Sequence, residues 1–170
     1  MSLLGRGVSV FGEPIDGGPP TRCTESISVD AQAPPVALRS QVTQRFDTGI
    51  KSIDGMLTCG RGQRVGIFAG AGVGKSVLVE QIATQSFADV TVVGLIGERG
   101  REVRDMLSRM KRNSMVVVAA TSDRSPMERT RGARAATAVA EYFRNQGANV
   151  LLVVDSLTRY AMALREIGLS

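Results

Sequence analysis

A glycine-rich segment in the first half of the chain has the residue types and spacing of a phosphate-binding loop. Residues 69–76 read Ala-Gly-Ala-Gly-Val-Gly-Lys-Ser. Glycines let the backbone curl until successive N–H groups point at phosphate oxygens, and a following helix N-terminus adds positive charge. The lysine of such a loop reaches the terminal phosphates, and the next hydroxyl ligates magnesium. The residues predicted to bind the nucleotide are Gly70, Ala71, Gly72, Val73, Gly74, Lys75, Ser76 and Val77.

The alternative is a chance glycine-rich turn, and the flanking sequence argues against it. The apolar run 65–69 predicts a buried strand before the loop, and residues 77–83 predict a helix after it. Strand, loop and helix in this order are the context that the motif requires. Ala69 stands where the strict pattern has its first glycine, and its small side chain is expected to leave the loop intact.

Asp155 is a candidate magnesium ligand, because it ends the apolar run 150–155. In a parallel sheet, ligands bind beyond the carboxyl ends of the strands, so this carboxylate would face the phosphate loop. It would hold Mg²⁺ directly or through water. A simple helix cap explains an aspartate at this position equally well.

Glu98 is a candidate catalytic base, since it follows another apolar run, 91–96. Hydrolysis of a phosphoanhydride needs a group that orients and polarises the attacking water. The alternative is that Glu98 and Glu102 belong to a charged helix start, where acidic residues are favourable. Spacing alone leaves both interpretations open.

The elements that must position these residues alternate along the chain. Short β-branched runs predict strands over 65–69, 90–96, 115–119 and 150–155, each buried on both faces. Helical stretches lie between them, and the longest has Ala136, Val139, Ala140 and Phe143 on one face, with Gly147 closing it. Strand–helix alternation predicts an α/β fold with a mainly parallel sheet.

The first 46 residues have a different composition from the rest. Most of the prolines and several glycines lie there, which predicts an extended, loop-rich arm over 1–46 before a domain over 47–170. The chain of 170 residues can form one sizeable core, and 43% of it is apolar and 22% charged. No run is long enough for a transmembrane helix.

Several site classes are excluded or disfavoured by composition. Histidine is absent, so histidine catalysis and histidine metal ligation are excluded. Cys23 and Cys59 match no metal-ligand or redox spacing, which favours a reducing cytoplasm as the location. The net charge of +5 permits nucleic acid or acidic lipid as a partner, but more often reflects a solvated surface.

Seven motifs in fixed order make the chain resemble the export ATPases of bacterial flagella and type III secretion injectisomes, relatives of the rotary ATP synthase catalytic subunit. The resemblance covers roughly residues 45–169, and weakly 4–17. It rests on the segments 47–54, 62–64, 69–76, 94–103, 120–123, 140–144 and 155–160.

The resemblance implies a RecA-like P-loop core with ATP and Mg²⁺ as its ligands. It implies that Glu98 positions water, that Lys75 and Ser76 contact phosphate and magnesium, and that Asp155 completes the magnesium site. It places Arg99 and Arg159 near the γ-phosphate. The glutamate also distinguishes the chain from the non-catalytic subunits of the synthase.

Family members are longer than this chain. They begin with a small β-barrel, and residues 1–46 are interpreted as what remains of its connection to the core. They continue past residue 170 with further strands, an arginine supplied to the neighbouring subunit, and a helical domain. The core 47–170 is therefore interpreted as a partial ATPase domain, truncated at its C-terminus, and weak activity is expected of it alone.

The resemblance also implies partners and a location. The expected assembly is a hexameric ring of identical subunits. The expected partners are stalk and regulator proteins of the export apparatus, secretion substrates and their chaperones. The expected location is the cytoplasm, peripheral to the inner membrane. Two alternatives stay open: a fragment that binds nucleotide without hydrolysing it, and a related RecA-like nucleic-acid motor. A basic patch interleaved with aromatic residues, which would favour the motor, is absent from the sequence.

Overall fold

The computed structural model describes residues 3–70, 72–110 and 113–169, with nothing stated of the Leu38 side chain. The chain divides into two compact units, one formed by residues 1–31 and 88–170 and the other by residues 32–87. The boundary between residues 46 and 47 suggested by composition thus lies inside the second unit.

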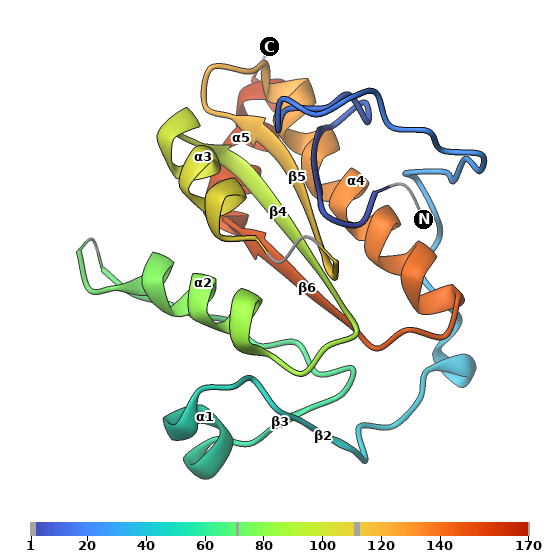
Figure 1. Cartoon of the computed structure of the whole chain (residues 1–170), viewed down its shortest axis with the longest axis vertical. Helices are drawn as coiled ribbons and strands as arrows, with labels where there is room; N and C mark the ends of the chain where they lie inside the picture. Colours follow the sequence, from blue (N-terminus) through green and yellow to red (C-terminus); the bar gives the residue numbers. More distant parts are fainter. Residues whose placement is uncertain (1–2, 71, 111–112, 170) are drawn as a thin grey trace. The chain divides into compact units, whose positions relative to one another are not determined.

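The first unit is built on a four-stranded parallel sheet in the order β1-β5-β4-β6 (Figure 1). Its strands are β1 (Arg6–Ser9), β4 (Val90–Glu98), β5 (Met115–Thr121) and β6 (Val150–Asp155). The strands predicted over 90–96, 115–119 and 150–155 are confirmed. β4 is buried along its whole length, whereas β6 is only half-buried up to Asp155.

Two helices cover opposite faces of this sheet, α3 (Gly100–Arg109) and α4 (Pro126–Asn145). A Cβ added to Gly94 would lie 2.9 Å from Ala136 of α4, whereas one added to Gly7 would meet Leu107 of α3. Gly94 pairs in register with Val118 and Gly7 with Val117. Because neighbouring residues of a strand point to opposite faces, the two helices lie on different sides.

The core lies between the sheet and α4. The apolar face predicted for this helix is confirmed, since Ala136, Ala140 and Phe143 pack against buried valines of β1, β4 and β5. Ser125 caps the start of the helix, where its Oγ accepts the Glu128 amide at 3.2 Å, and the chain turns away after the helix at Gly147 with φ +89°. Full burial of each valine stabilises the fold by roughly 1.5–3 kcal/mol.

Residues 6–9 of the N-terminal arm form an edge strand of the main sheet, which composition did not predict. A four-residue strand next to glycine and proline turns leaves a weak sequence pattern, and its place is fixed by the burial of Val8 and Val10. Beyond residue 9 the arm is mostly irregular, apart from the 3₁₀ turn η1 (Val36–Leu38) and the two-residue strand β2 (Arg45–Phe46), which both belong to the second unit.

A partly buried ion pair between Arg6 and Asp16 joins the arm to β1. The Asp16 carboxylate accepts hydrogen bonds from Arg6 Nε at 2.7 Å, from Arg6 Nη2 at 3.0 Å and from the Gly7 and Gly18 amides. The Arg6 guanidinium holds the pKa of Asp16 well below its ordinary value, and the two amides act in the same direction.

Asp16→Asn is therefore expected to destabilise the chain by roughly 1.5–3 kcal/mol at neutral pH. Since the pKa of Asp16 is depressed in the folded state, its contribution is present above the ordinary value of 3.8 and lost as pH falls further. Urea unfolding at pH 7 and pH 3 measures this. The exposed pair of Asp30 with Arg134 is the control, and Asp30→Asn should change stability by only about 0–1 kcal/mol. Equal effects of the two substitutions would contradict the assignment.

The second unit contains α1 (Lys51–Met56), α2 (Lys75–Gln85) and the short antiparallel pair β2 (Arg45–Phe46) and β3 (Cys59–Gly60). The Asp54 carboxylate accepts hydrogen bonds from the Thr48 amide at 2.8 Å, the Thr48 hydroxyl at 2.7 Å and the Gly49 amide at 2.9 Å. These contacts order the turn before α1 and hold the pKa of Asp54 below its usual range.

The strand predicted over 65–69 is wrong. Residues 63–70 are irregular, and the Phe68 side chain is almost entirely exposed. An apolar run of this kind becomes a strand only where neighbouring strands satisfy its backbone groups. No described strand pairs with residues 65–69, so the sequence pattern lacks the partners on which it depends.

Candidate functional site

The phosphate loop leads directly into α2, as the motif requires. Gly72 and Gly74 have φ values of +78° and +95°, and a Cβ added to either would meet nothing within 4 Å. Gly74 is the N-cap of α2, with Lys75 and Ser76 as the first two helical residues, and no described side chain caps the helix. Ala71 lies outside the described residues.

This arrangement fits a phosphate group. The first N–H groups of a helix have no partner within the helix, and the helix dipole favours an anion beside them. Here the cap is a glycine in the left-handed region rather than an oxygen-bearing side chain. The donors are backbone amides with Lys75, while the Ser76 hydroxyl is of the type that ligates Mg²⁺.

Glu98 is the last residue of β4 and follows a break in the regular pairing with β5, between Ile96 and Glu98. Gly97 lies at the break with φ +70°. The Glu98 residue is 8% exposed, and its Oε1 lies 3.0 Å from Arg159 Nε. Arg159 also donates from Nη1 to the Gly97 carbonyl at 2.7 Å. The guanidinium thus holds both the backbone and the carboxylate at this strand end.

The surroundings of Glu98 bring its pKa close to neutral pH. Burial raises the pKa of Glu98 to about 7, the Glu102 carboxylate acts in the same direction, and the charge of Asp155 adds to the effect. The Arg159 charge opposes this rise in the pKa. A general base works best with a pKa near the working pH, so the environment suits Glu98 to take up a proton.

The contacts of Glu102 bear on whether Glu98 and Glu102 both belong to a charged helix start. Its Oε2 accepts the Arg99 amide at 3.4 Å, and Glu102 lies in the first turn of α3. A hydrogen bond with Glu98 lowers the pKa of Glu102. The helix-start interpretation therefore applies to Glu102, whereas Glu98 belongs to the strand. Arg99 is the exposed N-cap residue of α3.

Asp155 ends β6 opposite Leu95 of β4 and is 8% exposed. The next helix, α5 (Leu157–Gly168), has Ser156 as its N-cap, and Ser156 Oγ accepts the Arg159 amide at 3.4 Å. Asp155 thus lies one residue before the cap and does not serve as it. The carboxylate remains a candidate magnesium ligand.

The sheet unit thus brings Glu98, Asp155 and Arg159 to one end of neighbouring strands, with Arg99 beginning the adjacent helix. The loop residues Gly70, Gly72–Ser76 and Val77 belong to the other unit. Sequence reasoning missed Gly97, although its place between an apolar run and Glu98 was the available signal.

Gly97→Ala is expected to destabilise the chain by roughly 1–3 kcal/mol and to displace Arg159. The added Cβ would lie 3.0 Å from Arg159 Cδ at a backbone angle that alanine rarely adopts. Thermal unfolding measures the stability. Gly100→Ala is the matched control, because its Cβ would meet nothing within 4 Å. A Gly97→Ala protein as stable as that control would refute the strain argument.

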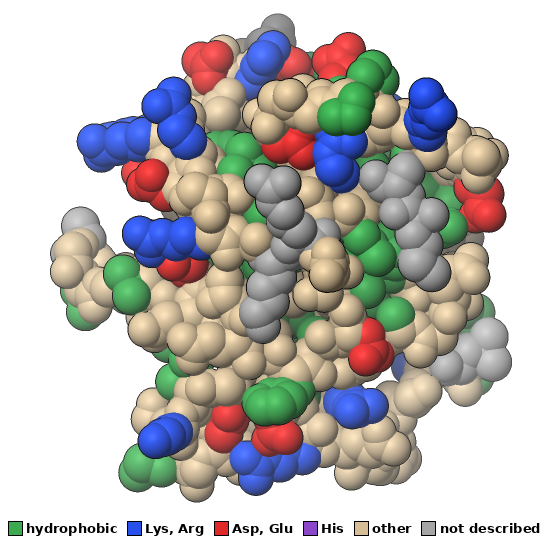
Figure 2. Space-filling model, in the orientation of Figure 1, with side chains coloured by type: hydrophobic (Ala, Val, Ile, Leu, Met, Phe, Trp, Pro, Cys, Tyr) green, Lys and Arg blue, Asp and Glu red, His purple; other side chains and the backbone are tan. Residues whose placement is uncertain are grey.

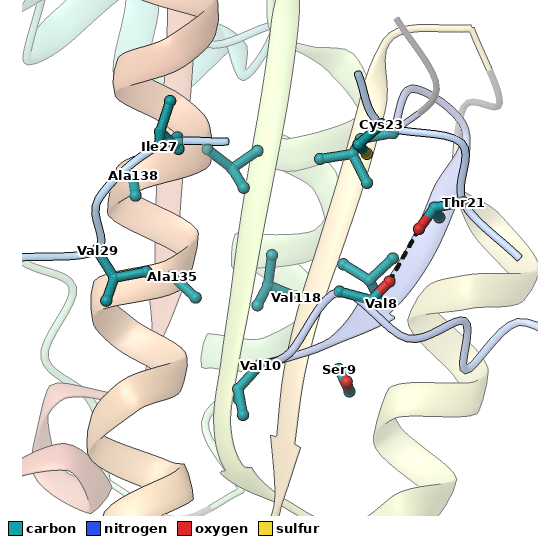
Figure 3. Close-up of a pocket in the computed structure, with 13 residues that line it drawn as sticks. Val8, Ser9, Val10, Thr21, Cys23, Ile27, Val29, Val118, Ala135 and Ala138 are labelled. Carbon is teal, nitrogen blue, oxygen red and sulfur yellow. Dashed lines mark hydrogen bonds between the residues drawn. The ribbon is translucent and has the colours of Figure 1, made fainter. Parts of the chain in front are cut away.

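An apolar cavity of about 160 Å³ lies elsewhere in the same unit, between the arm, β1 and α4 (Figure 3). Figure 3 shows Val8, Val10, Val118, Ala135 and Val29 around it, while Thr21 Oγ1 donates to the Gly12 carbonyl at 3.0 Å. Such a lining offers little to bind phosphate. On the visible surface, positive and negative side chains are interspersed (Figure 2).

Comparison with known proteins gives consistent relatives. The chain is 46% identical to the flagellum-specific ATP synthase of Bacillus subtilis and 49% identical to the type 3 secretion system ATPase of Xanthomonas euvesicatoria. Each match covers 99% of this chain and 39% of the relative. The chain thus spans about two fifths of the length of these curated relatives.

A solved structure resembles the fold closely. The assembled ATPase EscN with its central stalk EscO, from the type III secretion system of enteropathogenic E. coli, matches with a TM-score of 0.91 and 47% identity. That match covers 99% of this chain and 43% of EscN. None of the described helices is long and apolar enough to span a membrane. Residues 49–170 match the model of the ATP synthase alpha/beta family, nucleotide-binding domain, and the chain belongs to this family.

Proposed function

We propose that this chain is the ATP-hydrolysing core of a bacterial flagellar or type III protein-export ATPase, and that hydrolysis drives unfolding and export of substrates. The observation that carries the proposal is Glu98: a buried carboxylate at a strand end, bound by Arg159, with a pKa raised to about 7. A chain that only bound nucleotide would have no need of such a base.

In this proposal the loop and Lys75 bind the phosphates, and Glu98 accepts a proton from the attacking water. Arg99 and Arg159 balance the negative charge of the γ-phosphate. Ser76 and Asp155 would hold Mg²⁺, which neutralises phosphate charge when bound. For Arg159 this role requires its guanidinium to serve the phosphate as well as Glu98.

The structure of EscN, described as an assembled ATPase with a central stalk, supports an oligomer and a stalk among the partners. We propose a homo-oligomeric ring, a stalk and regulators, and secretion substrates with their chaperones, at the cytoplasmic face of the inner membrane. We also propose that residues 47–170 form part of the catalytic domain and that 1–46 connect it to a preceding domain.

Binding and turnover, measured separately on this chain and on the complete protein, test the proposal. The chain is expected to bind MgATP and to hydrolyse it near background. The complete protein should turn over, because an arginine from a neighbouring subunit contributes on the order of 10³–10⁵ in rate. Hydrolysis by the chain at a rate independent of its concentration would contradict a site completed by a neighbouring subunit. Binding without turnover in the complete protein would leave a nucleotide-binding subunit instead.

A further inference from the structure

Arg129 of α4 is a partly buried arginine that the proposed chemistry does not use. Its side chain is 15% exposed, and it forms a two-point ion pair with Glu166 of α5. Nη1 lies 3.3 Å from Glu166 Oε1, and Nη2 contacts Oε2. Its Nε donates to the Arg124 carbonyl at 3.2 Å, just before α4 begins. The guanidinium is thus fixed on both edges.

This pair is geometrically linked to the strand end that carries Glu98. Arg159 and Glu166 are seven residues apart on α5, about two turns, so they share one face of the helix. The same face meets Gly97 near one end and Arg129 near the other. A Cβ added to Gly97 would lie 3.0 Å from Arg159 Cδ and 3.6 Å from Arg129 Cδ. The stems of the two arginines therefore pack beside Gly97 from different helices.

We propose that Arg129 is a positioning residue. By binding Glu166, Arg129 fixes the rotation of α5 about its axis and its position along that axis. In this position Arg159 reaches the Gly97 carbonyl and the Glu98 carboxylate. The catalytic meaning of this contact rests on the proposed function, whereas the contact itself is a property of the fold. A bidentate pair suits this role because the planar guanidinium fixes direction as well as distance.

The direct test is the solvent exchange of the Arg159 Nε proton, followed by NMR in this chain without nucleotide. Arg129→Ala should speed this exchange about tenfold, because the ion pair of Arg159 Nε with Glu98 Oε1 loosens. Arg129→Lys keeps the charge but loses the two-point contact of the guanidinium with Glu166. It should therefore show most of the increase in exchange rate. Arg144→Ala is the matched control, since Arg144 is an exposed arginine of α4 that pairs with Glu141 of the same helix. It should leave the exchange unchanged.

Charge reversal separates positioning from general destabilisation. Arg129→Glu alone should release Arg159, and adding Glu166→Arg should restore slow exchange. If Arg129→Ala does not fold, Glu166→Gln breaks the same pair from the more exposed side. Unchanged Arg159 exchange in a folded Arg129 or Glu166 variant would overturn the inference.

In the complete protein, Arg129→Ala should lower kcat and leave the KM for MgATP unchanged, because the phosphate loop is untouched. A raised KM with unchanged kcat would overturn the catalytic part of the inference. The exchange measurement requires no hydrolysis. If the Arg129 variant alters the exchange but the complete wild-type protein is inactive, the result counts against the proposed function and not against the contact.

Discussion

Replacing Glu98 by glutamine is expected to preserve ATP binding and to reduce hydrolysis by about 10²–10⁴-fold in the complete protein. Glutamine is nearly isosteric, so the contact with Arg159 can persist, but an amide cannot take the proton of the attacking water. Steady-state turnover and MgATP affinity, measured on the same preparation, check both halves. Turnover within a few-fold of wild type would remove Glu98 from the mechanism.

The pH dependence gives an independent control. Only ionised Glu98 can act as the base, so wild-type hydrolysis should rise as pH increases through about 7. The contribution of Glu98 to the free energy of unfolding should instead decrease as pH increases. Because the pKa is raised in the folded state, the neutral carboxyl's contribution is full below the ordinary value of 4.5 and is lost as pH rises through about 7. Glu98→Gln should abolish both trends.

Lys75→Ala is expected to eliminate the stabilisation of this chain by MgATP. Nucleotide at 100 times its Kd would raise the unfolding free energy by about 2.7 kcal/mol. Loss of the lysine removes charge-assisted contacts that contribute roughly 1.5–3 kcal/mol each. The measurement is the thermal unfolding midpoint with and without MgATP.

Lys51→Ala is the control for this experiment, because Lys51 is an exposed residue of the same unit, at the start of α1. It should retain the full MgATP-dependent shift. A shift that persists in Lys75→Ala would show that the glycine-rich loop is not the nucleotide site.

The sequence predicted best those elements whose pattern reflects their own packing. Residues 90–96 and 115–119 are rich in β-branched residues because they are buried on both faces, and both form strands. Residues 65–69 have the same pattern but no described strand beside them, and they stay irregular. Periodicity reports what a segment can bury, and a strand also needs partners for its backbone.

The candidate site was predictable only in part. Glu98 and Asp155 were found because each carboxylate follows an apolar strand. The role of Arg159 came from resemblance, whereas its two contacts at Gly97 and Glu98 depend on how α5 packs, which no local pattern encodes. The pair of Arg129 with Glu166 joins residues 37 positions apart and has no sequence signature.

The edge strand β1 has a consequence for biosynthesis. Gly7 pairs with Val117, so 110 residues separate the partners. At about 5–20 residues per second, a growing chain exposes Val8 and Val10 for roughly 5–20 s before their neighbours in β5 are translated. A segment that waits so long is available to chaperones, and slower translation before residue 115 should increase that capture.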